Sequence, residues 1–74
     1  MQYDKIGLYI RKKREAMDMS LNAFAIANDI DPAILSRIET LKQDIKLNIL
    51  KKIAHGFEKT AGEFLIEFEK ECKQ

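Results

Sequence analysis

Residues 21–40, LNAFAIANDIDPAILSRIET, decide the fold expected for this chain. Their apolar side chains recur with helical spacing in two short blocks, one on each side of Asn28-Asp29. Asn and Asp tolerate the left-handed backbone conformation that a sharp turn needs. Asp31 suits a helix N-cap and Pro32 the first helical position, so a new helix is expected to begin there. The stretch therefore predicts two short helices joined by a tight turn.

Two helices joined in this way form the helix-turn-helix arrangement, whose second helix can enter the major groove of DNA. We expect it over about residues 21–40. The net charge of the chain is only +1, but its distribution is uneven. Residues 1–55 carry ten Lys/Arg and seven Asp/Glu, a net +3, whereas residues 56–74 carry three and five, a net −2. The basic excess thus lies in the part that contains the expected helix-turn-helix.

Composition argues against several other classes of protein. Cys72 is the single cysteine, so an intramolecular disulfide, a cysteine-based zinc site and a redox CxxC motif are all excluded. The chain has no nucleophile–base pairing, glycine-rich phosphate loop or metal-ligand spacing, so we expect no enzymatic activity, cofactor or metal. No segment approaches the roughly 18 apolar residues of a membrane span, and the first residues do not open a signal peptide. We expect a single cytoplasmic domain over residues 1–74, with no membrane association and no small-molecule ligand.

Helical periodicity continues on both sides of residues 21–40 and predicts an all-α domain of five helices. Met17 and Leu47 are expected on the inner faces of the first and fourth helices, and Lys13 on the outer face of the first with Arg11 and Lys12. A capping box, Thr60-Ala61-Gly62-Glu63, opens the last helix, and Glu67 is expected on the solvent-facing side of that helix. The expected ranges are about 4–17, 20–28, 32–39, 47–57 and 61–72.

From Ile6 to Leu65 the chain resembles the phage-repressor/Cro-like helix-turn-helix family, often called XRE. The matching segments are IGLYIRKKR, MSLNAFA, LSRIE, Lys42, LNILKKIAHGF and TAGEFL. The resemblance implies a five-helix, lambda-repressor-like DNA-binding domain that acts as a sequence-specific transcriptional regulator on double-stranded DNA. Leu41 stands where the family commonly has glycine, which leaves open the path of the chain after the third helix.

The resemblance also implies where DNA is contacted. The N-terminus of the second helix would meet a phosphate, the outward side of the third helix would read bases, and the following loop would hold phosphates. Arg37 is the one strong base reader on this surface, most naturally of guanine, and Ala33 or Ile34 can pack on a thymine methyl group. The alternative is that the third helix binds protein and no longer reads DNA. The residues implied are Ser20, Leu21, Pro32, Ala33, Ile34, Arg37, Lys42, Gln43 and Lys46.

Arg14 and Glu39 fall where the family often has a partly buried ion pair between the first helix and the end of the third. The resemblance therefore implies that these two residues form a structural pair. The alternative interpretation is two unrelated surface charges.

The last helix is expected to mediate a symmetric homodimer on a palindromic operator, with half-sites about 34 Å apart. Small controller proteins of restriction–modification systems resemble this chain in length and in having a helical tail, and they dimerise through that tail. The alternative is that this helix only completes the monomer core. The residues expected at the dimer interface are Phe64, Leu65, Ile66, Phe68 and Cys72.

A function of another class stays open on the same fold. An acidic C-terminal helix that bears aromatic residues would suit a protein-binding module, such as an antitoxin or adaptor, with weak or no DNA binding. The dependence of binding on salt separates the two functions, because DNA binding weakens steeply as salt rises.

Overall fold

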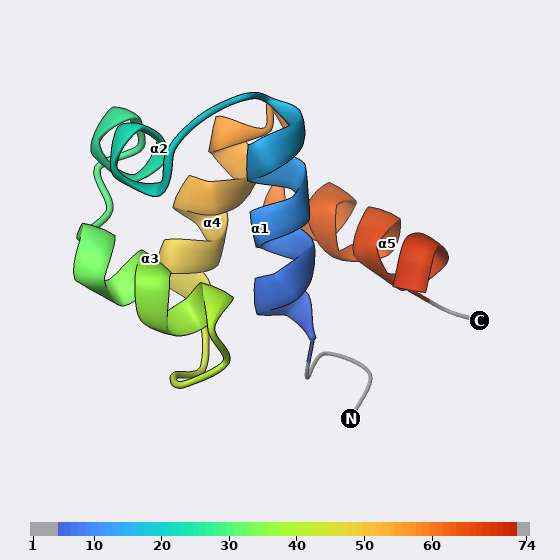
Figure 1. Ribbon diagram of the computed structural model, residues 1–74. Coiled ribbons are helices and arrows are strands. Elements are labelled where there is room, and N and C mark those ends of the chain that lie inside the picture. Colours follow the sequence, from blue (N-terminus) through green and yellow to red (C-terminus); the bar gives the residue numbers. More distant parts are fainter. Residues whose placement is uncertain (1–4, 73–74) are drawn as a thin grey trace.

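Five helices make up the part of the chain that the computed structural model describes, residues 5–72 (Figure 1). This confirms the expected all-α, five-helix fold. The first helix is shorter than expected, because Met17 follows its last residue and Asp4 lies outside the described residues. The helices are α1 (Ile6–Ala16), α2 (Leu21–Ala27), α3 (Pro32–Glu39), α4 (Leu47–Gly56) and α5 (Ala61–Cys72).

Side chains cap α2, α3 and α5 at the expected positions, whereas no described side chain caps the N-terminus of α1 or α4. Ser20 Oγ accepts a hydrogen bond from the main-chain N–H of Ala23 at 3.1 Å, and Asp31 Oδ1 accepts one from Ala33 at 2.9 Å. The capping box before α5 is also present: Thr60 Oγ1 accepts from the N–H of Glu63, and Glu63 Oε1 accepts from the N–H of Thr60. These bonds satisfy main-chain donors that a helix leaves free at its N-terminus.

The first four helices end in the same way. The residue after each C-cap, Asp18, Asp29, Leu41 or Glu58, has a φ between 57° and 61°. After α3, the N–H of Leu41 donates to Ile38 O at 3.1 Å and that of Lys42 to Arg37 O at 2.8 Å, which is a Schellman motif. Leu41 therefore adopts the conformation that glycine usually supplies, at a cost of about 1–2 kcal/mol.

Aromatic rings join the helices through the core. The ring of Phe57 stacks on Phe24 of α2 and on Phe64 of α5, with centroids 4.9 and 5.6 Å apart. Tyr9 of α1 contacts both Phe64 and Phe68. The two phenylalanine side chains of α5 are 0% and 1% exposed, so they complete the monomer core. The expectation that they centre a dimer interface is wrong, because neither ring has surface left for a second chain.

The expectation that Met17 and Leu47 lie in the core is also wrong. Met17 is 46% exposed because α1 ends before it, and Leu47 is 65% exposed because it occupies the first turn of α4, beyond the end of the core. Ile53 and Ala54, further along α4, are fully buried as expected.

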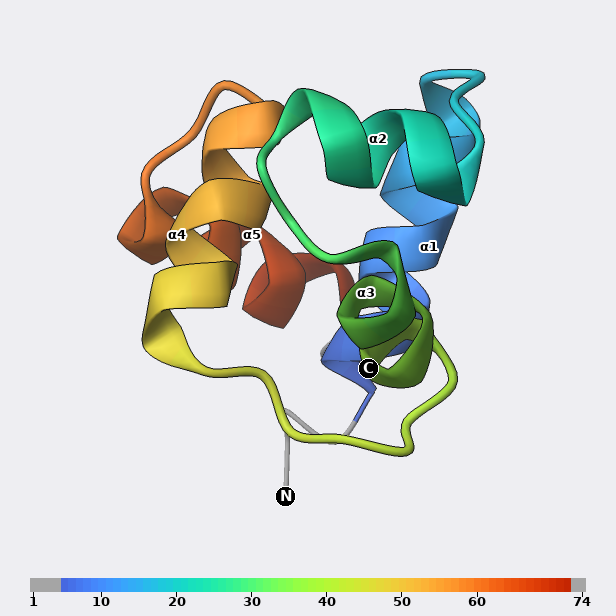
Figure 2. The ribbon, with the colours of Figure 1, turned by 90° about the vertical axis from the view of Figure 1, so that its left-hand side faces the viewer.

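α2 and α3 lie on one side of α1, and α5 lies on the other (Figure 1). Turning the molecule brings α2, α3 and the loop after α3 to the front, with α5 behind them (Figure 2). The helix-turn-helix and the loop after α3 thus lie on a face away from α5 (Figure 2).

Candidate nucleic-acid interface

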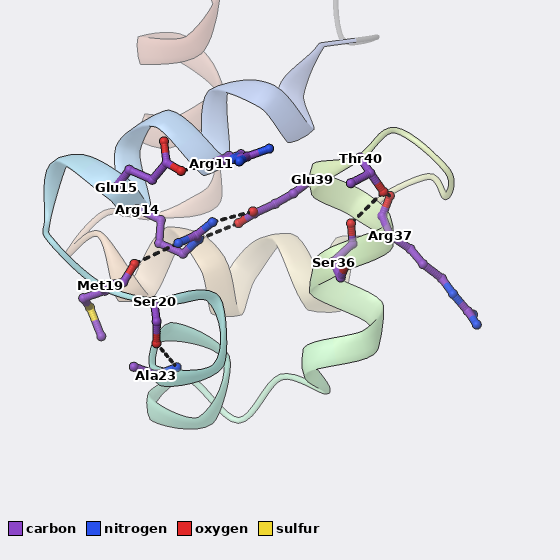
Figure 3. A network of polar contacts seen from close by, with 10 residues as sticks. All are labelled: Arg11, Arg14, Glu15, Met19, Ser20, Ala23, Ser36, Arg37, Glu39 and Thr40. Atoms are coloured by element: carbon purple, nitrogen blue, oxygen red, sulfur yellow. Dashed lines mark hydrogen bonds and ion pairs between the residues drawn. The ribbon is translucent and has the colours of Figure 1, made fainter.

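The solvent-facing side of α3 is set by what its other side buries. Leu35, Ile38 and Glu39 are buried, which leaves Ala33 and Arg37 exposed one helical turn apart. The Arg37 side chain extends away from the fold into solvent (Figure 3). Within residues 5–72 no carboxylate forms an ion pair with it. Its guanidinium donors are therefore free to meet a ligand.

Pro32 and Ile34 flank this exposed strip. Both side chains are half-buried, and Ile34 packs against the core. At the N-terminal turn of α3, the surface offered outward is consequently small and apolar, with Ala33 at its centre.

Basic side chains adjoin α3 in the loop that leads to α4. Lys42 and Lys46 are exposed, Gln43 is half-buried, and the intervening Asp44 is exposed. In the described part of the chain, no ion pair involves either lysine. A positive surface thus lies beside the outward side of α3, as phosphate binding requires.

The N-terminus of α2 offers a hydroxyl and main-chain N–H groups. Ser20 is exposed, and since its oxygen accepts from Ala23, its proton remains free for an anion. Leu21 is half-buried and packs against the core, so its side chain serves packing more than contact with a ligand.

Arg14 ties the three helices of this region together. Its Nε and Nη2 donate to the two carboxylate oxygens of Glu39 at 2.8 Å each, and its Nη1 donates to the main-chain oxygen of Met19 at 2.8 Å (Figure 3). Arg14 is 7% exposed and Glu39 2%. The hydrogen bond to Glu39 raises the pKa of Arg14 despite the opposing effect of burial. The structure thus joins the two residues that the resemblance paired and adds a link to the residue before Ser20.

A second long-range contact, which the sequence analysis did not predict, fixes the turn between α2 and α3. Lys52 Nζ of α4 donates to the main-chain oxygen of Asp29 at 2.9 Å, with the Asp29 carboxylate at 3.5 Å. Asn28 Nδ2 donates to Phe24 O at 2.8 Å, and its amide lies against Gly56. Pairs of residues 23 apart in the chain carry no local spacing signal that could have pointed to this contact.

The outer side of α1 is less basic than expected. Lys13 Nζ lies 3.2 Å from Glu67 Oε1 of α5, and the Tyr9 hydroxyl donates to the same oxygen at 2.9 Å. Lys59 Nζ lies 3.5 Å from the other oxygen of Glu67. Lys13 and Glu67 therefore fasten α5 to α1, which corrects the expectation that both face solvent.

The remaining residues expected on α5 are placed as follows. Leu65 is half-buried against the core and Ile66 is 55% exposed. Cys72 is the last residue of the helix, and its side chain lies outside the described part of the structure.

Comparison with known proteins matches most of the chain to a family model. A family model described as helix-turn-helix matches residues 10–64, which include α2, α3, α4 and every residue expected to contact DNA. No curated protein and no solved structure matches the chain significantly. Among the described helices, none is long and apolar enough to cross a membrane.

Proposed function

We propose that this chain, which belongs to the XRE-type helix-turn-helix family of DNA-binding regulators, recognises a specific operator as a homodimer and so regulates transcription. The observation that carries the proposal is Arg37, an exposed guanidinium on the outward side of α3 (Figure 3), with the exposed Lys42 and Lys46 in the loop that follows this helix. The family is of a non-enzymatic domain type, which agrees with the absence of catalytic motifs from the sequence.

In this mechanism the N-terminal end of α3 enters the major groove. Arg37 donates two hydrogen bonds to O6 and N7 of guanine, a contact worth about 1–3 kcal/mol of discrimination. Ser20, Lys42 and Lys46 hold phosphates, which fix the register of the protein and supply most of the affinity. The Arg14–Glu39 pair and the Lys52–Asp29 contact keep α2 and α3 in a fixed relative orientation.

Salt dependence tests DNA binding directly. Affinity for a random-sequence duplex should fall steeply with salt, with log K decreasing by about 0.9 for each neutralised phosphate per unit of log salt. Lys42→Ala should reduce this slope by about 1. Absence of detectable binding at the lowest salt would refute the proposal.

A homodimer is proposed because one short helix with a single strong reader binds weakly, whereas two copies can occupy half-sites about 34 Å apart. The burial of Phe64 and Phe68 leaves Leu65 and the exposed Ile66 as the apolar groups of α5 available to a partner. Sedimentation at high protein concentration should give a dimer mass, and Ile66→Glu a monomer mass. Ile26→Glu, at an exposed position on α2, is the matched control and should leave the dimer intact. A monomer mass for the unaltered chain would exclude the homodimer.

The burial of Phe64 and Phe68 also weakens the protein-binding alternative. That function depended on aromatic side chains displayed by an acidic C-terminal helix, and these two rings lie inside the core.

A further inference from the structure

We propose that α3 reads the C5-methyl group of a pyrimidine, so that the preferred half-site places thymine or 5-methylcytosine within two base pairs of the guanine bound by Arg37. The inference rests on the proposed DNA binding and makes it more specific, because it names a chemical group on the DNA that the protein senses. Cytosine methylation at that position would then raise affinity.

The composition of the exposed strip of α3 carries the first step. At its N-terminal turn the strip offers Ala33, flanked by the half-buried Pro32 and Ile34, and none of these side chains has a hydrogen-bonding group. In the major groove every base edge except the C5-methyl group is recognised by hydrogen bonding. The methyl group is therefore the feature of a base pair that this turn can favour.

The spacing along the helix carries the second step. Ala33 and Arg37 are four residues apart on one face, so their Cβ atoms lie about 5–6 Å from each other. Base pairs of B-DNA stack about 3.4 Å apart. This separation spans between one and two base-pair steps, so the methyl group that Ala33 contacts lies within two base pairs of the guanine that Arg37 binds.

The lengths of the two side chains agree with the docking geometry. A recognition helix approaches the base edges with its N-terminal residues. Ala33, which is short, lies in the first turn of α3, where the helix is nearest to the bases, while the long side chain of Arg37 starts one turn further back. Both side chains can therefore reach the base edges at the floor of the major groove while the helix keeps a single orientation.

Asp31, at the N-terminal end of α3, is the one side chain there that could favour a group on the DNA other than a methyl group. Its Oδ1 accepts from Ala33 N, but its second oxygen is free to accept from the N4 amino group of cytosine. Reading by Asp31 would favour cytosine irrespective of methylation, so a comparison of cytosine with 5-methylcytosine separates the two modes.

The test begins with selection of bound sequences from a random duplex pool. The winning duplex is remade with uracil for thymine in the two base pairs on either side of the selected guanine, and then with cytosine and with 5-methylcytosine at the same positions. The protein should bind duplexes with thymine about fourfold more tightly per half-site than duplexes with uracil, and duplexes with 5-methylcytosine about fourfold more tightly than duplexes with cytosine. This is the effect expected for burying one methyl group. Uracil placed away from the guanine should have no effect.

Ala33→Gly should abolish the preference for thymine over uracil. Ala27→Gly, an exposed alanine at the end of α2, is the matched control for a glycine in a helix and should keep the preference. Equal affinity for thymine and uracil, equal affinity for cytosine and 5-methylcytosine, or a selected motif without thymine within two base pairs of the guanine would each overturn the inference and leave DNA binding intact. Failure to bind any duplex at low salt would instead refute the proposed function, and this inference with it.

Discussion

Arg14 on α1 and Glu39 at the end of α3 share two hydrogen bonds of 2.8 Å in an almost fully buried position. Both oxygens of the carboxylate are occupied, and the third bond of the guanidinium, to Met19 O, holds the chain just before α2. A bidentate pair of this kind is directional, so it specifies how α1, α2 and α3 meet. The candidate DNA-binding surface depends on that arrangement.

Glu39→Ala should destabilise the fold by about 3 kcal/mol, because it leaves the Arg14 charge buried without its partner. Urea unfolding measures the change. Glu15→Ala is the control: it removes an exposed pair with Arg11 on the same helix as Arg14, and should cost well under about 1 kcal/mol. Similar losses for the two variants would contradict a structural role for the buried pair.

Gly7 permits the close crossing of α1 and α3. A Cβ atom there would overlap the main-chain oxygen of Ile38, so Gly7→Ala should destabilise the protein by at least about 1–3 kcal/mol. Gly62 of α5 is exposed, and the nearest atom to a Cβ there is Thr60 Oγ1 at 4.0 Å, so Gly62→Ala should instead stabilise by up to about 1 kcal/mol. Thermal unfolding of both variants checks the opposite signs, and a Gly7→Ala protein as stable as the parent would show that the helices do not cross as described.

Much of the fold was predictable because its signals are local. Ser20, Asp31 and the Thr60–Glu63 box announce helix starts by residue type and short spacing, and these caps are present. None of the four positive-φ residues that follow the helices is a glycine, so the positive φ of Leu41 had no residue-type signal, unlike that of Asp29. Periodicity also placed Met17 and Leu47 inward, but it does not say where a helix leaves the core.

The candidate site was predicted less completely, because side chains compete for long-range partners. Arg37 and Lys42 lie exposed where the resemblance put them, yet Leu21 and Ile34 turn partly into the core. Lys13 and Glu67 looked like solvated charges, and the Tyr9 hydroxyl that gathers them lies 58 residues from Glu67 in the chain. The aromatic stripe of α5 could serve either a core or a dimer, and only the packing of Tyr9 and Phe57 around it decides for the core.

Attachment of α5 should weaken in acid through Glu67. Burial acts to raise the pKa of Glu67, but hydrogen bonds from Tyr9 and Lys13 and the charges of Lys13 and Lys59 outweigh it, so its pKa lies below the usual 4.5. Since folding depresses this pKa, the stabilisation is present above the unfolded-state value and is lost as pH falls through the lower folded-state value.

Urea unfolding at neutral pH and in steps below pH 4.5 measures this loss. Glu67→Gln should be less stable at neutral pH and should lose less stability on acidification. Tyr9→Phe, which removes only the hydroxyl, should shrink the same acid-dependent loss. An acid profile of Glu67→Gln parallel to that of the parent would mean that this carboxylate does not fasten α5.

Glu58 is the clearest place to relieve backbone strain. It is exposed after α4 with a φ of 61°, so Glu58→Gly should stabilise the protein by about 1 kcal/mol. Glu63→Gly, in the capping box and first turn of α5, should destabilise it and serves as the contrast. A rise in the unfolding midpoint for Glu58→Gly checks the left-handed turn, and a fall would contradict it.

The most direct test of sequence reading by α3 is selection of bound sequences from a random duplex pool, carried out in parallel for the parent, Arg37→Ala and Lys42→Ala. The parent should yield a defined motif, and Arg37→Ala a motif relaxed at one position per half-site. Lys42→Ala should give the parental motif with weaker binding to all sequences. An Arg37→Ala motif identical to that of the parent would contradict the assignment of Arg37 as the base reader of this helix-turn-helix.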